Sequence, residues 1–194
     1  MRKTIAAILV LVVVWIAYAV WPFFALHGLV RAIERGDAAA IAWYVDFSAV
    51  RVSLTQQIVE TYARLTGRQD NPLGAGAAVA ATSIADPIVA KLINPEAFAE
   101  MMQNGWPVTV LPEKPPDAVG LTAETVGTAW QLFGASEYGI ARFYVAVPAS
   151  FPHPQRFSFG FRLAQWRWRL ASVRLPEAIQ VRLAEELIKA LQRR

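Results

Sequence analysis

Residues 156–163 have the sequence RFSFGFRL, and this stretch sets the architecture of the second half of the chain. Its residues alternate in character: Phe157, Phe159, Phe161 and Leu163 lie on one side, and Arg156, Ser158, Gly160 and Arg162 on the other. Strict alternation is typical of a β-strand with one buried face, because successive side chains of a strand point to opposite sides. The sequence therefore predicts a strand whose phenylalanines face a core.

Two neighbouring segments show the same period of two. The apolar side chains that share one face of residues 138–147 are Phe143, Val145 and Val147. A third strand is expected over residues 168–175, where Leu170 and Val173 fall out of phase, as they do at a β-bulge. The short connections between these segments favour an antiparallel meander of three to four strands.

The first half of the chain, and its very end, have helical periodicity instead. Helices are expected over residues 26–33, 37–44, 50–65, 77–93 and 94–105, with a loop at 67–76, a break at Asp86-Pro87 and a final helix from Pro176-Glu177. Asp37, Asp46 and Asn94 stand where short polar side chains cap a first turn. A loop over residues 106–120, with four prolines, joins the two halves. Helices followed by a meander predict the α+β class, with residues 27–194 as a single domain.

The segment before this domain, residues 5–26, is apolar and uncharged. It reads IAAILVLVVVWIAYAVWPFFAL, and no charged residue occurs between Lys3 and Arg31. About 20 helical residues cross a bilayer core, and aromatic residues gather at its interfaces. We therefore expect a single-pass anchor over residues 5–26 that leaves the membrane near Pro22. The basic start, residues 1–4, is expected to remain in the cytoplasm.

A cleaved signal peptide is the alternative reading of the same segment. A basic start, an apolar run and Ala17-Tyr18-Ala19 resemble the three regions of such a signal. The apolar run continues past Ala19, which favours a retained anchor. Both interpretations export residues 27–194, to the periplasm or the extracellular side, from the inner membrane of a bacterium.

Several segments carry a likeness to a known family. Trp21-Pro22, Gly36-Asp37 and the segment Val45-Asp46-Phe47-Ser48-Ala49-Val50-Arg51 resemble a bacterial family described only as domain of unknown function 2939. The helix from Asn94-Pro95-Glu96 and the strand with Trp168-Arg169-Leu170 look similar too. The resemblance implies no activity. At the level of architecture, the helices and sheet are also similar to NTF2-like or cystatin-like folds, an analogy that transfers no function.

Few residues support catalysis or metal binding. The chain has no cysteine, which excludes disulfides, thiolate catalysis and iron–sulfur clusters, and it has two histidines, His27 and His153. No nucleotide-binding or hydrolase motif is complete, so we expect no cofactor and no metal site. Among the acids, Asp46 is either a cap that pairs with Arg51 or a buried general base.

Charge is distributed unevenly along the chain. Residues 27–124 carry 7 basic and 11 acidic side chains, whereas residues 125–194 carry 10 basic and 4 acidic ones. A basic sheet region beside a membrane anchor suggests contact with anionic lipid headgroups. The arginines expected in that contact are Arg156, Arg162, Arg167, Arg169 and Arg174. No nucleic-acid recognition motif accompanies them, and export argues against that partner.

The sequence favours a membrane-anchored envelope protein that acts as a non-catalytic binding or accessory module. Its partners would be the lipid bilayer, an anionic lipid or another envelope protein. A ligand cavity could be lined by aromatic residues of the sheet: Phe157, Phe159, Phe161 and Trp168. Three alternatives remain open: a small-pocket enzyme using Asp46, a structural subunit of an envelope complex, and a secreted soluble domain.

Overall fold

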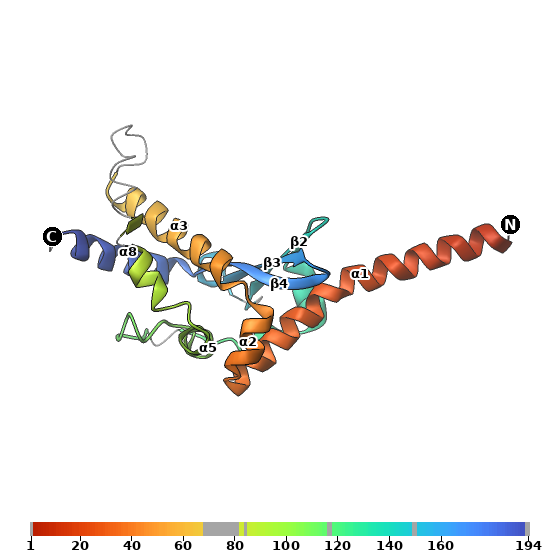
Figure 1. The fold of residues 1–194 in the computed structure, drawn as a ribbon, viewed down its shortest axis with the longest axis horizontal. Helices are drawn as coiled ribbons and strands as arrows, with labels where there is room; N and C mark the ends of the chain where they lie inside the picture. The colour runs from red at the N-terminus through yellow and green to blue at the C-terminus, as the bar shows by residue number, and fades with distance from the viewer. Residues whose placement is uncertain (1, 68–81, 84, 116–117, 149–150, 193–194) are drawn as a thin grey trace.

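The computed structural model describes residues 2–67, 82–83, 85–115, 118–148 and 151–192 (Figure 1). Its helices are α1 (Arg2–Arg35), α2 (Ala38–Tyr44), α3 (Phe47–Leu65), α5 (Pro95–Asn104), α6 (Ala123–Val126), α7 (Ala129–Gly134) and α8 (Glu177–Gln192). Its strands are β1 (Ser136–Tyr138), β2 (Arg142–Val147), β3 (Phe157–Ala164) and β4 (Arg167–Arg174). This confirms the predicted α+β class: an apolar N-terminal helix, further helices, a four-stranded antiparallel sheet and a C-terminal helix.

Helix α1 is longer than the sequence suggested. It continues through Pro22 to Arg35, so the apolar N-terminal segment and the first helix of the domain form one element. Pro22 does not end the helix, because one proline removes a single N–H and helices tolerate it where neighbours pack around them. The expected membrane exit near Pro22 stays a prediction. Pro22 is buried against the rest of the chain. Figure 1 shows the N-terminal part of α1 projecting alone from the molecule.

The sheet is a meander in the order β1-β2-β3-β4. The predicted strand over residues 138–147 is in fact two strands, β1 and β2, joined by a tight turn. A register shift opposite Gly160 and Phe161 is the expected bulge, and it returns Leu170 and Val173 of β4 to the buried face. That face contains the phenylalanines of β2 and β3.

Helices cover the sheet from two directions. The second half of α1 packs on the buried face, where the rings of Phe23 and Phe143 meet edge-on with centroids 5.0 Å apart. Helix α3 runs along β4 and against α8. Gln57 joins α3 to β4, since its amide donates to the carbonyl of Val173 (2.6 Å) and accepts from the N–H of Leu175 (3.0 Å).

Short polar side chains cap the N-termini of three helices, as the sequence predicts. Asp37, Asp46 and Asn94 each accept a hydrogen bond from a backbone N–H in the first turn of α2, α3 and α5. The helices α6 and α7 were not predicted, because four and six residues are too few to show a period. Residues 68–81 and 84 lie outside the described residues. They include nearly all of the loop expected at 67–76 and the start of the helix expected at 77–93. Residues 85–90 are helical.

Candidate functional site

The β1–β2 and β3–β4 turns of the sheet both lie beside α1. The hydroxyl of Tyr18 donates a hydrogen bond to the carbonyl oxygen of Ile140, in the β1–β2 turn. The hydroxyl of Tyr138 donates to the carbonyl oxygen of Ala19 at 3.3 Å. At the second hairpin, the rings of Tyr18 and Trp168 lie 6.1 Å apart. The sheet therefore reaches along α1 as far as residues 18–19.

These tips present large apolar side chains to the surroundings. Ile140 is 94% exposed in the β1–β2 turn, and Trp166 is 81% exposed in the β3–β4 turn. Both residues of the latter turn, Gln165 and Trp166, have positive φ angles (52° and 59°), as in the tight turns that suit a twisted hairpin. Phe133 at the end of α7 is exposed as well. Ile140 and Trp166 are more exposed than the large apolar side chains of Ile5–Ala17.

Only a short part of α1 makes no contact with the rest of the domain. Its side chains are exposed from Lys3 to Ala17, and contacts with the sheet begin at Tyr18. The apolar part of that free segment, Ile5–Ala17, spans about 20 Å at 1.5 Å per residue. A bilayer core is about 30 Å thick. Among the described residues, α1 is the one helix that is long and apolar enough to cross a membrane, and its free part alone is too short to do so.

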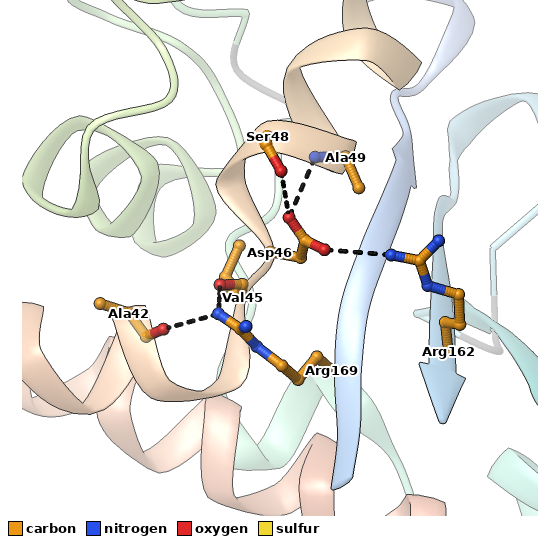
Figure 2. Close-up of polar contacts among 7 residues, drawn as sticks. All are labelled: Ala42, Val45, Asp46, Ser48, Ala49, Arg162 and Arg169. Carbon is orange, nitrogen blue, oxygen red and sulfur yellow. Dashed lines mark hydrogen bonds and ion pairs between the residues drawn. The ribbon is translucent and has the colours of Figure 1, made fainter. Parts of the chain in front are cut away.

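Three arginines lie side by side on the polar face of the sheet, opposite the face that contains the phenylalanines. These residues, which we call the arginine row, are Arg142, Arg162 and Arg169. The strand register pairs Arg142 with Arg162 and Arg162 with Arg169. Like charges directly opposite one another are unfavourable, so the row needs neighbouring anions or acceptors. Figure 2 shows the acceptors that Arg162 and Arg169 contact.

Asp46 and the backbone of the α2–α3 junction accept hydrogen bonds from these two arginines. The carboxylate of Asp46 accepts from Arg162 at 3.1 Å, and one nitrogen of Arg169 donates to the carbonyl oxygens of Val45 (2.7 Å) and Ala42 (3.2 Å). The N–H of Asp46 in turn donates to the carbonyl of Leu170 at 2.8 Å. This junction attaches the start of α3 to the edge of β4 (Figure 2).

The surroundings of Asp46 stabilise its charged form. The Ser48 hydroxyl lowers the pKa of Asp46 most, burial opposes this, and the Ala49 N–H, Arg169 and Arg162 lower it further. A carboxylate with a lowered pKa is a weaker general base. The expected pairing with Arg51 is wrong: Arg51 forms a two-point hydrogen-bonded ion pair with Asp86, through which the pKa of Asp86 is lowered.

The other predicted arginines lie in different surroundings. The guanidinium of Arg167 sits over the ring of Trp43, 4.3 Å from its centroid. The Nε of Arg156 donates to the carbonyl of Phe151. Arg156 and the exposed Arg174 border a polar groove of about 660 Å³ between α3 and the polar sheet face. Of the five predicted arginines, Arg162 and Arg169 belong to the arginine row, Arg156 and Arg174 border the groove, and Arg167 lies over Trp43.

The predicted ligand-lining aromatics lie in the core. Phe159 and Phe161 are fully buried, and Trp168 is nearly so. Phe157 borders a cavity of about 300 Å³ that also contacts Trp106 and Phe151. Among the described residues, no group of three or more His, Asp or Glu side chains is arranged to hold a metal ion.

Sequence reasoning missed the hairpin tips. Ile140 and Trp166 are single apolar residues inside turns, and no periodic pattern includes them. Arg142 was also not selected, because its place beside Arg162 depends on strand register. A usable signal existed at Trp166, since a bulky aromatic residue is unusual in a two-residue turn.

Comparison with known proteins supports the family resemblance. Residues 11–101 match the family model described as "Protein of unknown function (DUF2939)". The match includes most of α1 together with α2, α3 and most of α5, and it ends before the sheet. Neither the comparison with curated proteins nor that with solved structures gave a match. The likeness to NTF2-like folds stays a prediction.

Proposed function

We propose that this chain, which through residues 11–101 belongs to the DUF2939 family, is a single-pass inner-membrane protein whose exported domain rests on the bilayer. In this arrangement the N-terminus is cytoplasmic and residues 27–194 form a non-catalytic accessory module on the periplasmic side. The module contacts anionic lipid headgroups through its sheet. An apolar helix near the N-terminus would also serve as a signal sequence, so the proposal depends on its contacts with the domain.

The observation that carries the proposal is the position of the hairpin tips on α1. If the helix enters the hydrocarbon core near Ile5, about 20 residues bring it out near Phe24. The tips contact α1 already at Tyr18 and Ala19. They would therefore lie inside the outer edge of the bilayer, where the exposed Ile140 and Trp166 gain an apolar environment.

The arginine row supports the same orientation. Arg162 and Arg169 stand three residues back from the Gln165-Trp166 turn, about 10 Å along the strands. With the tips in the hydrocarbon edge, that distance places the row near the lipid phosphates, because the headgroup region on each side is roughly 5–7 Å thick. Arginine binds phosphate through paired N–H donors.

Single-cysteine labelling tests this orientation directly, because the natural chain has no cysteine. The variants Ile140→Cys and Trp166→Cys are labelled with the environment-sensitive fluorophore NBD. The full chain is then reconstituted into phosphatidylcholine vesicles that contain phosphatidylglycerol and a nitroxide lipid. Gln192→Cys is the matched control, since it lies at the end of α8, opposite the N-terminal part of α1 (Figure 1).

The expected result is blue-shifted emission and nitroxide quenching at positions 140 and 166, and water-like emission without quenching at 192. Equal, water-like emission at all three positions would show that the domain stands clear of the bilayer. The intact mass of the membrane-bound protein separates anchor from signal: the retained form keeps Tyr18, whereas cleavage after Ala19 removes it. Reaction of the 192 variant with a membrane-impermeant maleimide from outside whole cells with a permeabilised outer membrane reports the orientation.

A further inference from the structure

An apolar groove runs beside α1 at the level of the hairpin tips. Its volume is about 580 Å³, within the roughly 300–1,000 Å³ of ligand sites. One wall is α1, and the other is the α6–α7 segment; the residues that matter here are Val20, Phe24, His27, Val126, Leu132 and Phe133. We call this cavity the α1 groove. Its lining is almost wholly apolar, and Phe24 at its mouth is 70% exposed.

The position of the groove along α1 indicates where its occupant comes from. Val20 and Phe24 are among the last of the about 20 residues that a bilayer core requires when counted from Ile5. The mouth of the groove would thus open into the outer half of the hydrocarbon core, among acyl chains. An apolar groove open to water attracts any apolar solute, but one that opens into a leaflet is filled from that leaflet.

The outer end of the groove adjoins two arginines and one aspartate, Asp37, so its net charge is positive. Phe24 and His27 also line a second cavity, of about 280 Å³, that continues along α1 to Arg31 and Arg35. Arg31 lies seven residues beyond Phe24, about 10 Å along the helix. Apolar walls at membrane depth are followed by Arg31, whose side chain leans toward the helix N-terminus and so back toward the phosphates. These two features match the two parts of a phospholipid.

We propose that the α1 groove binds one acyl chain of a bilayer phospholipid, whose anionic headgroup lies at Arg31. The inference rests on the proposed membrane orientation and extends it from surface contact to a defined lipid site. The occupant is a leaflet lipid, because the groove and its cationic end follow the bilayer normal along α1. The accessory module then holds a lipid partly withdrawn from its neighbours.

The test uses the full chain in phosphatidylcholine vesicles that contain phosphatidylglycerol with a diazirine at the end of one acyl chain. After illumination, peptides are mapped for adducts. Val126 and Leu132 are the diagnostic positions, since they are 7% and 8% exposed and are reached by a chain inside the groove. Ile140 and Trp166 serve as an internal reference for contact with bulk lipid. Adducts at both pairs are expected.

Variants separate the groove from the surrounding bilayer. Val20→Trp places an indole in the groove, and Val13→Trp, on the exposed part of the same helix, is the matched control. Val20→Trp is expected to reduce adducts at Leu132 about tenfold, the factor for roughly two methylene groups excluded from the groove. Adducts at Trp166 should be unchanged, and Val13→Trp should behave as the natural protein. Val20→Phe gives a smaller wedge if the tryptophan disturbs the fold.

The headgroup is tested with Arg31→Gln and a second probe, phosphatidylcholine with the same diazirine. Loss of Arg31 is expected to reduce the preference for phosphatidylglycerol about fivefold, as for one basic group at a membrane surface. Adducts at Ile140 and Trp166 without any at Val126 or Leu132 would overturn the lipid site and leave the proposed orientation intact. Absence of adducts at all four would overturn both. Labelling of the groove by a diazirine fatty acid, and not by the phospholipid, would overturn the phospholipid assignment.

Discussion

Tyr18 of α1 and Ile140 of the β1–β2 turn are 122 positions apart in sequence, and a hydrogen bond from the Tyr18 hydroxyl to the Ile140 carbonyl joins them. Tyr138 makes the reciprocal contact, donating to the carbonyl of Ala19. The apolar helix and the sheet are thus connected at two points of one hairpin, the end of β1 and the turn after it. A domain held this way does not swing freely on α1, because helix and hairpin move together.

Loss of the Tyr18 hydroxyl should loosen the β1–β2 hairpin. In Tyr18→Phe the ring remains against Trp168 but the hydrogen bond to Ile140 is lost, at a cost of about 1 kcal/mol. Hydrogen exchange in vesicles is expected to quicken at residues 138–142 and to remain unchanged in α8. Equal exchange rates at residues 138–142 in the natural protein and in Tyr18→Phe would show that the hydrogen bond does not hold the hairpin.

Asp46 supports the start of α3 in two separable ways. Asn caps a helix about as well as Asp, whereas Ala at the cap position costs about 1 kcal/mol. Asp46→Asn should therefore remove only the charge that faces Arg162, and Asp46→Ala both the charge and the cap. Thermal unfolding in detergent micelles at neutral pH should rank natural protein, Asp46→Asn and Asp46→Ala in order of falling stability.

The charge of Asp46 also predicts a pH dependence. Since the Ser48 hydroxyl and the other donors lower the folded-state pKa below its ordinary value of 3.8, the charged form contributes stability above that pH. The contribution is lost as pH falls through the folded-state pKa. The stability difference between the natural protein and Asp46→Asn should accordingly be constant from pH 7 to about pH 5 and shrink below about pH 4. A difference that grew on acidification would contradict the assigned contacts.

Gln57 is the polar connection between α3 and β4. Its substitution by Ala leaves the Val173 carbonyl and the Leu175 N–H without their partner, and an unsatisfied part-buried group costs roughly 1–3 kcal/mol. The exposed neighbour Gln56 on the same helix is the matched control, and Gln56→Ala should change stability by less than about 0.5 kcal/mol. Chemical unfolding in micelles measures both. Equal effects of the two substitutions would rule out a special role for Gln57.

Reversal of charge in the arginine row should alter the lipid environment. Arg142 is exposed beside Arg162, so Arg142→Glu removes a cation and adds an anion near the proposed headgroup level. Enrichment of spin-labelled phosphatidylglycerol around the protein is expected to fall at least about fivefold, the effect of one surface cation. Arg182→Glu on α8 is the control and should have no effect. A similar loss in both variants would indicate a response to net charge alone.

Substitutions on the buried face of α8 should disrupt folding and not assembly with another chain. Leu183 and Leu187 are fully buried in the core, so they are unavailable for docking to another chain. Leu183→Asp places an unpaired carboxylate in that core and should prevent folding, whereas Arg182→Asp beside it should not. Far-ultraviolet circular dichroism and protease resistance distinguish the two. A folded Leu183→Asp protein would contradict the burial of this helix face.

The local features of the fold could be predicted from the sequence. Alternation in residues 156–163 located β3, the phase change at Leu170 indicated the bulge, and Asn94-Pro95 located the start of α5. Each signal depends on neighbours in the chain, through strand alternation, capping or helical spacing. The two shortest helices, α6 and α7, escaped prediction because so few residues cannot express a period.

The sequence by itself determined the α+β class, the apolar N-terminal helix and the residues that begin its helices. Only the tertiary structure decided which distant residues meet: Tyr18 with Ile140, Arg51 with Asp86, and Arg162 with Asp46. Strand register and helix packing set these encounters, and both are collective properties of the buried face. The apolar helix could therefore be predicted from composition. The surface that would rest on a membrane could not, because its residues come from separate hairpins and from α1.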